Sequence, residues 1–331
     1  MRKNEGKNAT EADLDTLYRI ARQYYLENFT QEEIARKEGL SRPYVSRLLQ
    51  KCRDQGIVQV TLDYPFPTNV ELEVELKRQF SLAEAVVAVS GRHEEAGAVI
   101  SRVGAYYLST TLNSGDVLGV SWGRALLGIA RQLSYRPDKG TDVAQLVGGV
   151  VNTEVQTQAN ELVQTLAQKL GGKPYYLPAP LFTDTPEAAE MLKGEHLVME
   201  GIQRARMSTV ALVGIGSAFS NATLLKHARF PDETSRELER LGAVGDICGR
   251  WFTSEGVLCP SELDGRTIGI TLEELKRIPK VIAVAYGSEK VQAILGALRG
   301  GLMDVLITDD RTAAEILAQR RFVLSVNGEG S

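Results

Sequence analysis

The sequence is poor in cysteine and lacks long apolar runs. Its three cysteines, Cys52, Cys248 and Cys259, show no C-x-x-C spacing, so no disulfide framework is indicated. No stretch approaches the roughly 18 consecutive apolar residues of a membrane span, and the charged N-terminus lacks the apolar centre of a signal peptide. We therefore expect a soluble cytoplasmic protein without a membrane partner.

Basic residues are not in excess either. The formal net charge of the 331 residues is -4, whereas a non-specific nucleic-acid binder carries a strong positive field. Any contact with DNA must therefore come from a local basic segment. At roughly 150 residues per domain, the length predicts two domains.

Motifs of catalysis and cofactor binding are scarce as well. The three histidines, His93, His196 and His227, are far apart and match no metal-ligand spacing. The chain has no G-x-S-x-G elbow, no G-x-G-x-x-G fingerprint and no P-loop. We expect no metal and no cofactor, and nothing in the pattern requires an enzyme.

The N-terminal segment nevertheless carries a signal for DNA binding. Apolar spacing predicts a helix from about Glu11 to Glu27. The tetrapeptide "TQEE" forms a capping box that opens a second helix at Thr30, and Gly39 supplies the left-handed residue that ends it. Ser41 is the expected cap of a third helix. Two helices joined by a short turn with glycine match the helix-turn-helix motif, whose second helix enters the major groove.

The third predicted helix has one apolar face and one basic face. Val45, Leu48, Leu49 and Cys52 form the apolar stripe. Between residues 36 and 53, six basic residues stand against one acidic residue, a net charge of +5. The alternative is a solvated charged helix in a small bundle, but cap, turn, packing residues and basic face all coincide. We predict one set of DNA contacts around this helix: Gln31, Ser41, Arg42, Pro43, Tyr44, Ser46, Arg47 and Lys51.

A strand and a domain boundary follow. After Gly56, "IVQVTL" alternates apolar and polar residues as a strand does, which makes the domain winged-helix-like, although no partner strand is evident. Pro65 and Pro67 in "DYPFPTN" interrupt both helix and strand. We place a helix-turn-helix domain at residues 1–64 and a larger domain at residues 65–331.

The larger domain alternates short apolar runs with helical patterns. The predicted strands are "AVVAVS", "DVLGVSWG", "VAQLVGG", "YYLPAP", "TVALVGIGS", "VIAVAYGS" and "DVLITDD". Fully apolar strands that alternate with helices form a parallel sheet covered on both faces. The predicted fold class is therefore α/β, with a Rossmann-type larger domain.

Four of the predicted strands end in polar or glycine-rich tips: "SWGR", "GG", "GIGS" and "GSEK". Parallel sheets bind ligands at the carboxyl ends of their strands, and a helix N-terminus there favours an anion. Turn glycines are more often structural, but four tips on one edge favour a phosphorylated or carboxylated small molecule.

Individual side chains near these tips suit a sugar ligand. Lys290 begins a predicted helix, where the dipole disfavours a cation unless an anion is bound; the alternative is a solvated lysine. Gln158 and Asn160 can donate to sugar hydroxyls and Asp246 can accept from them, although simple exposure is the commoner explanation for such residues.

The ordered motifs "TQEEIARKEGLSRPYVSRLL", "GVSWGRAL", "QLVGG", "QAN", "VALVGIGS", "GAVGD", "GITLEEL" and "VIAVAYGSEKVQAILGALRGG" resemble the SorC family of bacterial transcriptional regulators. The resemblance covers nearly the whole chain. It implies a helix-turn-helix head, a sugar-binding domain with the fold of sugar-phosphate isomerases, a homotetramer, and control by a sugar or phosphosugar. The implied effector contacts are Ser121, Gly123, Arg124, Gly148, Gly149, Gln158, Asp246 and Lys290.

Two positions depart from the family pattern. Ala125 stands where threonine is frequent, and Thr253 follows Phe252 where aspartate is frequent. The lost hydroxyl and carboxylate favour an unphosphorylated polyol or ketose as a further candidate effector. Because one small head makes few phosphate contacts, we expect a homo-oligomer on an inverted-repeat operator. The runner-up function is a sugar-phosphate isomerase or deaminase with a DNA-binding head; an architectural DNA protein fits poorly with the acidic body.

Overall fold

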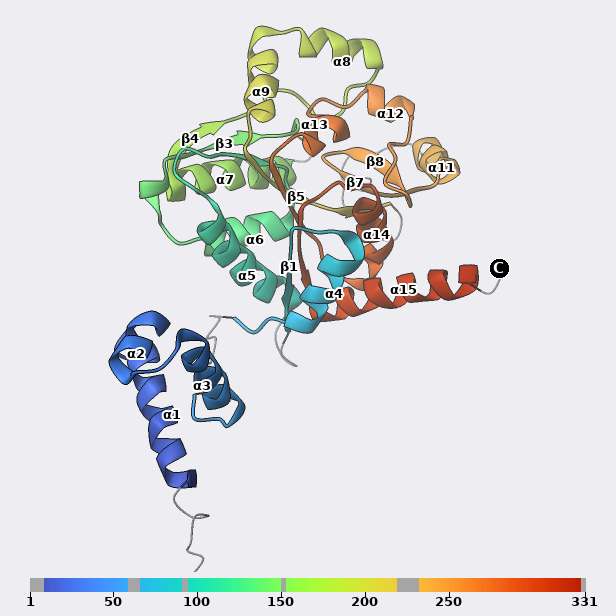
Figure 1. Cartoon of the computed structure of the whole chain (residues 1–331). Helices are drawn as coiled ribbons and strands as arrows, with labels where there is room; N and C mark the ends of the chain where they lie inside the picture. The colour runs from blue at the N-terminus through green and yellow to red at the C-terminus, as the bar shows by residue number, and fades with distance from the viewer. Residues whose placement is uncertain (1–8, 59–65, 91–94, 150–152, 219–231, 329–331) are drawn as a thin grey trace, which may run out of the picture. The chain divides into compact units, whose positions relative to one another are not determined.

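A computed structural model describes residues 9–58, 66–90, 95–149, 153–218 and 232–328 (Figure 1). The chain divides into two compact units, residues 1–65 and residues 66–331. Each unit is built around its own buried apolar residues.

The described part of the first unit consists of three helices, α1 (Ala9–Tyr25), α2 (Gln31–Glu38) and α3 (Arg42–Asp54). The predicted capping box at the start of α2 is confirmed. The Thr30 hydroxyl accepts the Glu33 N–H at 3.3 Å, and the Glu33 carboxylate accepts the Thr30 N–H at 2.8 Å. Gly39 ends α2 in the left-handed conformation with φ +67°, as predicted.

The core of the first unit lies where the three helices meet. The predicted apolar stripe of α3 is confirmed, because Val45, Leu48, Leu49 and Cys52 are all buried. They pack against α1 and α2, and the Cys52 thiol donates to the Leu17 carbonyl at 3.3 Å. This packing fixes which side of α3 faces solvent.

The prediction that the Ser41 side chain caps α3 is wrong. Ser41 occupies the N-cap position with extended backbone, but its side chain makes no capping hydrogen bond. Such a bond needs the N–H of the second or third helical residue. Pro43 has no N–H, and the Tyr44 N–H donates to the Ser41 carbonyl at 3.0 Å. The predicted strand after Gly56 falls mainly on residues outside those described, and Ile57 and Val58 are not in a strand.

The second unit is an α/β fold whose large sheet is parallel throughout its described strands. Its order is β1-β10-β9-β5-β2-β3-β4, which confirms the predicted parallel sheet. The strands are β1 (Glu84–Ala88), β2 (Val117–Val120), β3 (Thr141–Gln145), β4 (Gly171–Tyr175), β5 (Val210–Gly214), β9 (Lys280–Val284) and β10 (Val305–Asp309).

Helices cover both faces of this sheet (Figure 1). One face packs on α5 (Ala96–Thr111), α6 (Arg124–Gln132) and α7 (Thr153–Leu170), and the other on α4 (Val70–Phe80), α14 (Val291–Arg299) and α15 (Asp310–Gly328). Successive strand residues point to opposite faces. Leu306 packs on the face covered by α4, α14 and α15, whereas Val305 and Ile307 pack on the face covered by α5, α6 and α7. Both faces being buried explains the continuous apolar runs of the strands.

One predicted strand is wrong. The run "YYLPAP" is not the fourth strand, which instead spans Gly171–Tyr175 and ends at the first residue of the run. This strand pairs only with β3 at the sheet edge, and most of its residues are at least partly exposed. An exposed edge needs no apolar run and tolerates Pro174, so hydrophobic patterning does not find it.

A second sheet was not predicted. It is antiparallel with the order β6-β7-β8, formed by β6 (Gly216–Ser217), β7 (Ala243–Ile247) and β8 (Arg250–Thr253), and it packs on α14. Cys248 and Gly249 join its last two strands with φ +57° and +70°, the left-handed pair of a two-residue hairpin. The remaining elements are α8 (Pro186–Lys193), α9 (His196–Arg206), α11 (Asp232–Arg240), α12 (Glu262–Gly265), α13 (Leu272–Lys276), η1 (Pro137–Lys139) and η2 (Ser288–Lys290).

Candidate functional site

The large sheet reverses its winding direction between β2 and β5. From β2 the chain moves outward to β3 and β4, and then resumes on the other side of β2 with β5 and β9. Open parallel sheets bind ligands at the carboxyl edge of such a reversal. Ser121 lies directly after β2, and its hydroxyl accepts the Gly214 N–H at the end of β5 at 3.2 Å. Ser121 therefore joins the two strand ends at this point.

Asp246 on β7 contributes a buried carboxylate to this edge. It pairs with Gly216 of β6, where a Cβ would overlap the carboxylate. The Gly249 N–H donates to its Oδ2 at 3.2 Å. Burial raises the pKa of Asp246 to about 6, while the hydrogen bond from Gly249 and the charge of Lys290 act in the opposite direction. The structure thus holds a buried carboxylate beside the end of β6.

Lys290 supplies a half-buried cation beside Asp246. It ends η2, which packs against β6. Burial lowers the pKa of Lys290, the charges of Glu289 and Asp246 raise it, and the charge of Arg124 lowers it. The three side chains of Asp246, Lys290 and Arg124 are thus electrostatically coupled although they come from distant segments.

The N-terminus of α6 adds positive potential at the same edge. Gly123 occupies the N-cap position with φ +151° and has no side chain that could cap the first-turn N–H groups. Arg124 follows as an exposed first residue. Free N–H groups and an arginine at a helix N-terminus suit a phosphate or carboxylate.

Two of the predicted effector residues are placed differently. Gly148 and Gly149 are buried, and their N–H groups donate to the Ile268 carbonyl at 3.0 Å and the Ala179 carbonyl at 2.8 Å. A Cβ on Gly148 would overlap the Pro180 carbonyl, so close packing requires glycine there. Neither N–H is free for a ligand. The side chain of Gln158 lies outside those that the structure describes.

Sequence reasoning missed Tyr286 and the hydrogen bonds that hold its loop. Tyr286 follows β9, and its ring centroid lies 6.0 Å from the Lys290 Nζ. The buried Asp309 accepts the Thr312 hydroxyl at 2.6 Å, and that hydroxyl accepts the Gly287 N–H at 2.8 Å. The predicted tip "GSEK" begins at Gly287, one residue after Tyr286. The position of Tyr286 at the end of a predicted strand is the signal that could have identified it.

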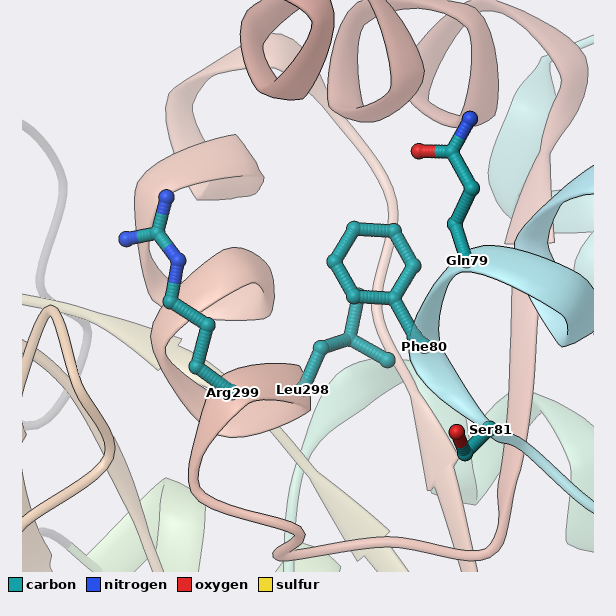
Figure 2. A pocket seen from close by; sticks show the side chains of 5 residues that line it. All are labelled: Gln79, Phe80, Ser81, Leu298 and Arg299. Carbon is teal, nitrogen blue, oxygen red and sulfur yellow. The ribbon is translucent and has the colours of Figure 1, made fainter. Parts of the chain in front are cut away.

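A separate small pocket of about 260 Å³ is lined by Gln79, Phe80, Ser81, Leu298 and Arg299 (Figure 2). It lies where α4 and α14 end, before β1 and β10 begin. Because those are the amino ends of the strands, this pocket is at the opposite edge of the sheet from Asp246 and Lys290. It is not the candidate effector site.

The first unit presents a basic face on α3. Ser41, Arg42, Pro43, Tyr44, Ser46 and Arg47 are all exposed, whereas Gln31 and Lys51 are half-buried. The Arg47 guanidinium lies 5.5 Å from the Tyr44 ring centroid. Among the described residues, neither Arg42 nor Arg47 forms an ion pair. Arg53, by contrast, donates to the Tyr25 hydroxyl at 2.8 Å, so it is tied to α1.

Two further kinds of site were searched for in the described parts of the chain. Within them, no cluster of His, Cys, Asp and Glu side chains is arranged to hold a metal ion. Likewise, none of the helices in those parts is long and apolar enough to cross a membrane.

Known proteins share both units. Residues 64–318 match the Sugar-bind family, described as a sugar-binding domain. The crystal structure of the full-length sorbitol operon regulator SorC from Klebsiella pneumoniae is 31% identical and superposes with a TM-score of 0.71, covering 92% of this chain and 99% of that one. The chain belongs to the SorC family.

Other relatives of this SorC-family protein are of similar length. The deoxyribonucleoside regulator of Bacillus subtilis (strain 168) is 36% identical over 299 residues, which cover 90% of this chain and 95% of the relative. The transcriptional regulator LsrR of Escherichia coli (strain K12) is 33% identical over 303 residues, covering 90% and 93%. Each match covers 90% or more of this chain, so it extends beyond the sugar-binding domain of residues 64–318 into the first unit.

Because Asp246 is buried, we expect its contribution to the free energy of unfolding to depend on pH. Its pKa is raised from 3.8 to about 6 in the folded chain, so the stability it contributes is fully present below pH 3.8 and is lost as pH rises through about 6. The difference in free energy of unfolding between the wild type and Asp246→Asn should therefore change by about 3 kcal/mol from pH 3.5 to pH 7.5. Denaturant titrations across this range measure it, and a pH-independent difference would contradict the assignment.

Proposed function

We propose that this chain is a sequence-specific transcription regulator of a carbohydrate operon, and that a sugar, polyol or sugar phosphate controls its binding to operator DNA. The observation that carries the proposal is the coupled group of Asp246, Lys290 and Arg124 at the carboxyl edge of the sheet. The relatives' names, which are those of regulators, support control of transcription over catalysis.

The first unit serves as a helix-turn-helix head in this proposal. The capping box of α2, the left-handed Gly39 and the buried stripe of α3 support it. With that stripe buried, Arg42, Ser46 and Arg47 remain on the outer side, where a recognition helix meets base edges. Their position at the start of α3 suits contacts in the major groove.

The effector contacts of the proposal are Ser121, Gly123, Arg124, Asp246 and Lys290. Arg124, Lys290 and the N-terminus of α6 suit one anionic group, and the Asp246 carboxylate suits a ligand hydroxyl. A sugar phosphate is therefore favoured. A polyol or ketose would use Asp246 but leave the cations without a partner. Gly148 and Gly149 shape the neighbouring segment without offering their N–H groups.

We further propose that the protein works in the cytoplasm as a homo-oligomer, a tetramer, on an inverted repeat. Large apolar side chains that are exposed on and beside α8 and α9 support self-association: Met191, Leu197, Met199 and Met207. Several linked heads raise the effective concentration of each head at its half-site.

The proposal is tested by selecting binding sites for the purified full chain from random duplex DNA. The selected site should be an inverted repeat, and at least one member of a panel of sugars, polyols and sugar phosphates should change operator affinity by about 5- to 150-fold. Turnover of panel members is assayed in the same samples. A chain that selects no DNA sequence, or that turns over a panel member without any change in DNA binding, contradicts the proposal.

Arg47 should be a main source of base specificity. Because Arg47 is exposed on α3 and forms no ion pair with the residues that the structure describes, it can form a bidentate contact with guanine. Arg47→Ala should weaken operator binding by about 1–3 kcal/mol and relax the preference at one base pair. Titrations with operators changed at single positions measure both effects. Arg22→Ala removes one positive charge from α1 instead and is the control; it should leave every base preference intact. If Arg47→Ala also leaves every base preference intact, Arg47 does not contact a base.

A further inference from the structure

The α/β unit begins with a short segment that is fastened to the edge of its sheet. Residues 66–69, here called the anchor, directly follow the boundary between the two units. Thr68 of the anchor pairs with Ala88 as an antiparallel bridge on β1, an edge strand of the large sheet. Two backbone N–H groups donate across this pair at 2.8 and 3.0 Å: Asn69 to the Val87 carbonyl and Val89 to the Pro67 carbonyl. The chain therefore enters the α/β unit as a short extension of its sheet.

One aromatic side chain adds to the anchor. Phe66 is half-buried and packs against the core on the face of the sheet that α5 covers. Its ring centroid lies 6.1 Å from that of Tyr106, with an angle of 72° between the rings, and 6.0 Å from the guanidinium carbon of Arg102. Because the anchor is held mainly by two backbone hydrogen bonds and one ring, it can open locally without unfolding the sheet.

The anchor and the candidate effector site lie at the same edge of the sheet. The anchor pairs with the last residues of β1, and the loop from Tyr286 to Lys290 follows the end of β9. Parallel strands bring their carboxyl ends to one edge. Within the sheet, β10 lies between β1 and β9, so its end is next to both the anchor and the loop.

Hydrogen bonds at the end of β10 connect the loop to the anchor. The Gly287 N–H donates to the Thr312 hydroxyl at 2.8 Å, and this hydroxyl donates to the Asp309 carboxylate at 2.6 Å. Both Thr312 and Asp309 are buried, which strengthens these hydrogen bonds. Asp309 ends β10 in register with Ala88 of β1, the residue that pairs with Thr68. A movement of the loop therefore reaches the anchor through two strand ends.

We infer that the anchor is the element through which the effector acts on the DNA-binding unit. Coupling between two sites requires an element with two arrangements that both sites bias. The anchor has a docked arrangement, which few contacts hold, and an open one, and it lies where the chain passes from one unit to the other. The inference rests on the proposed function and adds the part of the chain that transmits its regulation.

The first test locks the anchor in its docked arrangement. Thr68 and Ala88 form an antiparallel pair whose neighbours make the backbone hydrogen bonds, and such a pair places its Cα atoms about 4.5 Å apart. This distance suits a disulfide, so Thr68→Cys and Ala88→Cys are combined in the full chain. The native cysteines are buried, and the wild type treated with the same oxidant is the control.

Operator affinity of each protein is titrated with and without ribose 5-phosphate, fructose 6-phosphate and fructose 1,6-bisphosphate, under oxidising and reducing conditions. The oxidised double variant should respond by less than about twofold, whereas the wild type should respond by about 5- to 150-fold in both conditions. Reduction should restore the response of the double variant, because the anchor can then open. Thiol titration verifies that the disulfide has formed.

The second test follows the anchor in the chain without a disulfide. Hydrogen exchange of the Asn69 and Val89 amides reports its opening. At concentrations of the three sugar phosphates that saturate the protein by calorimetry, these exchange rates should change by at least about fivefold in the wild type. Thr312→Val, which removes the hydroxyl between Gly287 and Asp309, should abolish the change, and Thr312→Ser, which keeps that hydroxyl, should retain it.

The outcomes separate this inference from the proposed function. If none of the three sugar phosphates changes operator affinity in the wild type, the proposed control by a sugar phosphate is wrong. If the wild type responds and the oxidised double variant responds equally, the proposed function stands and the role of the anchor is overturned. Unchanged exchange of the Asn69 and Val89 amides in a wild type that responds likewise overturns it, and this measurement decides where the disulfide does not form.

Discussion

Replacing Arg250 by alanine is expected to lower the free energy of unfolding of the α/β unit by about 3–5 kcal/mol. Arg250 lies on β8 with only 4% of its surface exposed. Its guanidinium donates to the Asp264 carboxylate and carbonyl, both at 2.7 Å, and to the carbonyls of Ile270, Thr267 and Gly269 at 3.2–3.4 Å. Alanine would leave these buried acceptors without a donor.

The measurement is denaturant unfolding followed by tryptophan fluorescence. Trp122 and Trp251 are the only tryptophans of the sequence, and both lie in the α/β unit, so the signal reports that unit. Arg136→Ala is the matched control. Its pair with Asp138 has side chains that are 46% and 63% exposed, and removing such a pair costs about 1 kcal/mol or less. If Arg250→Ala is no more destabilising than the control, the buried network does not hold the segment between α12 and α13.

The part of the fold that was predictable is the part that is buried on both faces. Strands such as β9 and β10 carry apolar runs, Val281–Val284 and Val305–Ile307, because helices cover them on each side. The capping box at Thr30 and the turn at Gly39 could also be predicted, since both depend on residues close together in sequence. In these places local sequence and tertiary structure require the same residues.

The features that were missed depend on partners far away in sequence. The exposed edge strand β4 needs no apolar run, and the pairing of β6 with β7 joins Gly216 to Asp246 across a long connection. A buried arginine such as Arg250 is rare, and its acceptors cannot be recognised before the chain is folded. The glycines of the "QLVGG" tip have no distinguishing signal, because structural and ligand-binding glycines look alike in sequence.

Sequence reasoning named residues of the candidate site but not their arrangement. Asp246 and Lys290 were selected as isolated polar residues near strand ends, and the structure couples them to each other and to Arg124. The order of the strands could not be predicted from the sequence. This order brings the ends of β2 and β5 together at Ser121. Gly97 meets the Tyr286 side chain only because the first turn of α5 lies against the segment that follows β9.

Replacing Lys290 by alanine should abolish most of the effector response. Lys290 is half-buried at the proposed anion site, and the charges of Asp246 and Arg124 both act on it, so its loss leaves the anionic group of the ligand with one cation fewer. Removing one partner of such a pair costs about 2–5 kcal/mol, or roughly 30- to several-thousand-fold in effector affinity. Operator affinity in the absence of effector should change little, because Lys290 belongs to the α/β unit and not to the three-helix unit.

Linkage makes this expectation testable from both directions. If the effector changes operator affinity by some factor, operator DNA must change effector affinity by the same factor. The coupling free energy is typically about 1–3 kcal/mol. Calorimetric titration of wild type and Lys290→Ala with each sugar phosphate, with and without operator, measures both factors. Lys276→Ala, which removes a partly exposed lysine of α13, is the control and should behave as the wild type. A full response in Lys290→Ala would remove Lys290 from the site, whereas equal effector affinity with and without operator in the wild type would remove the allosteric mechanism itself.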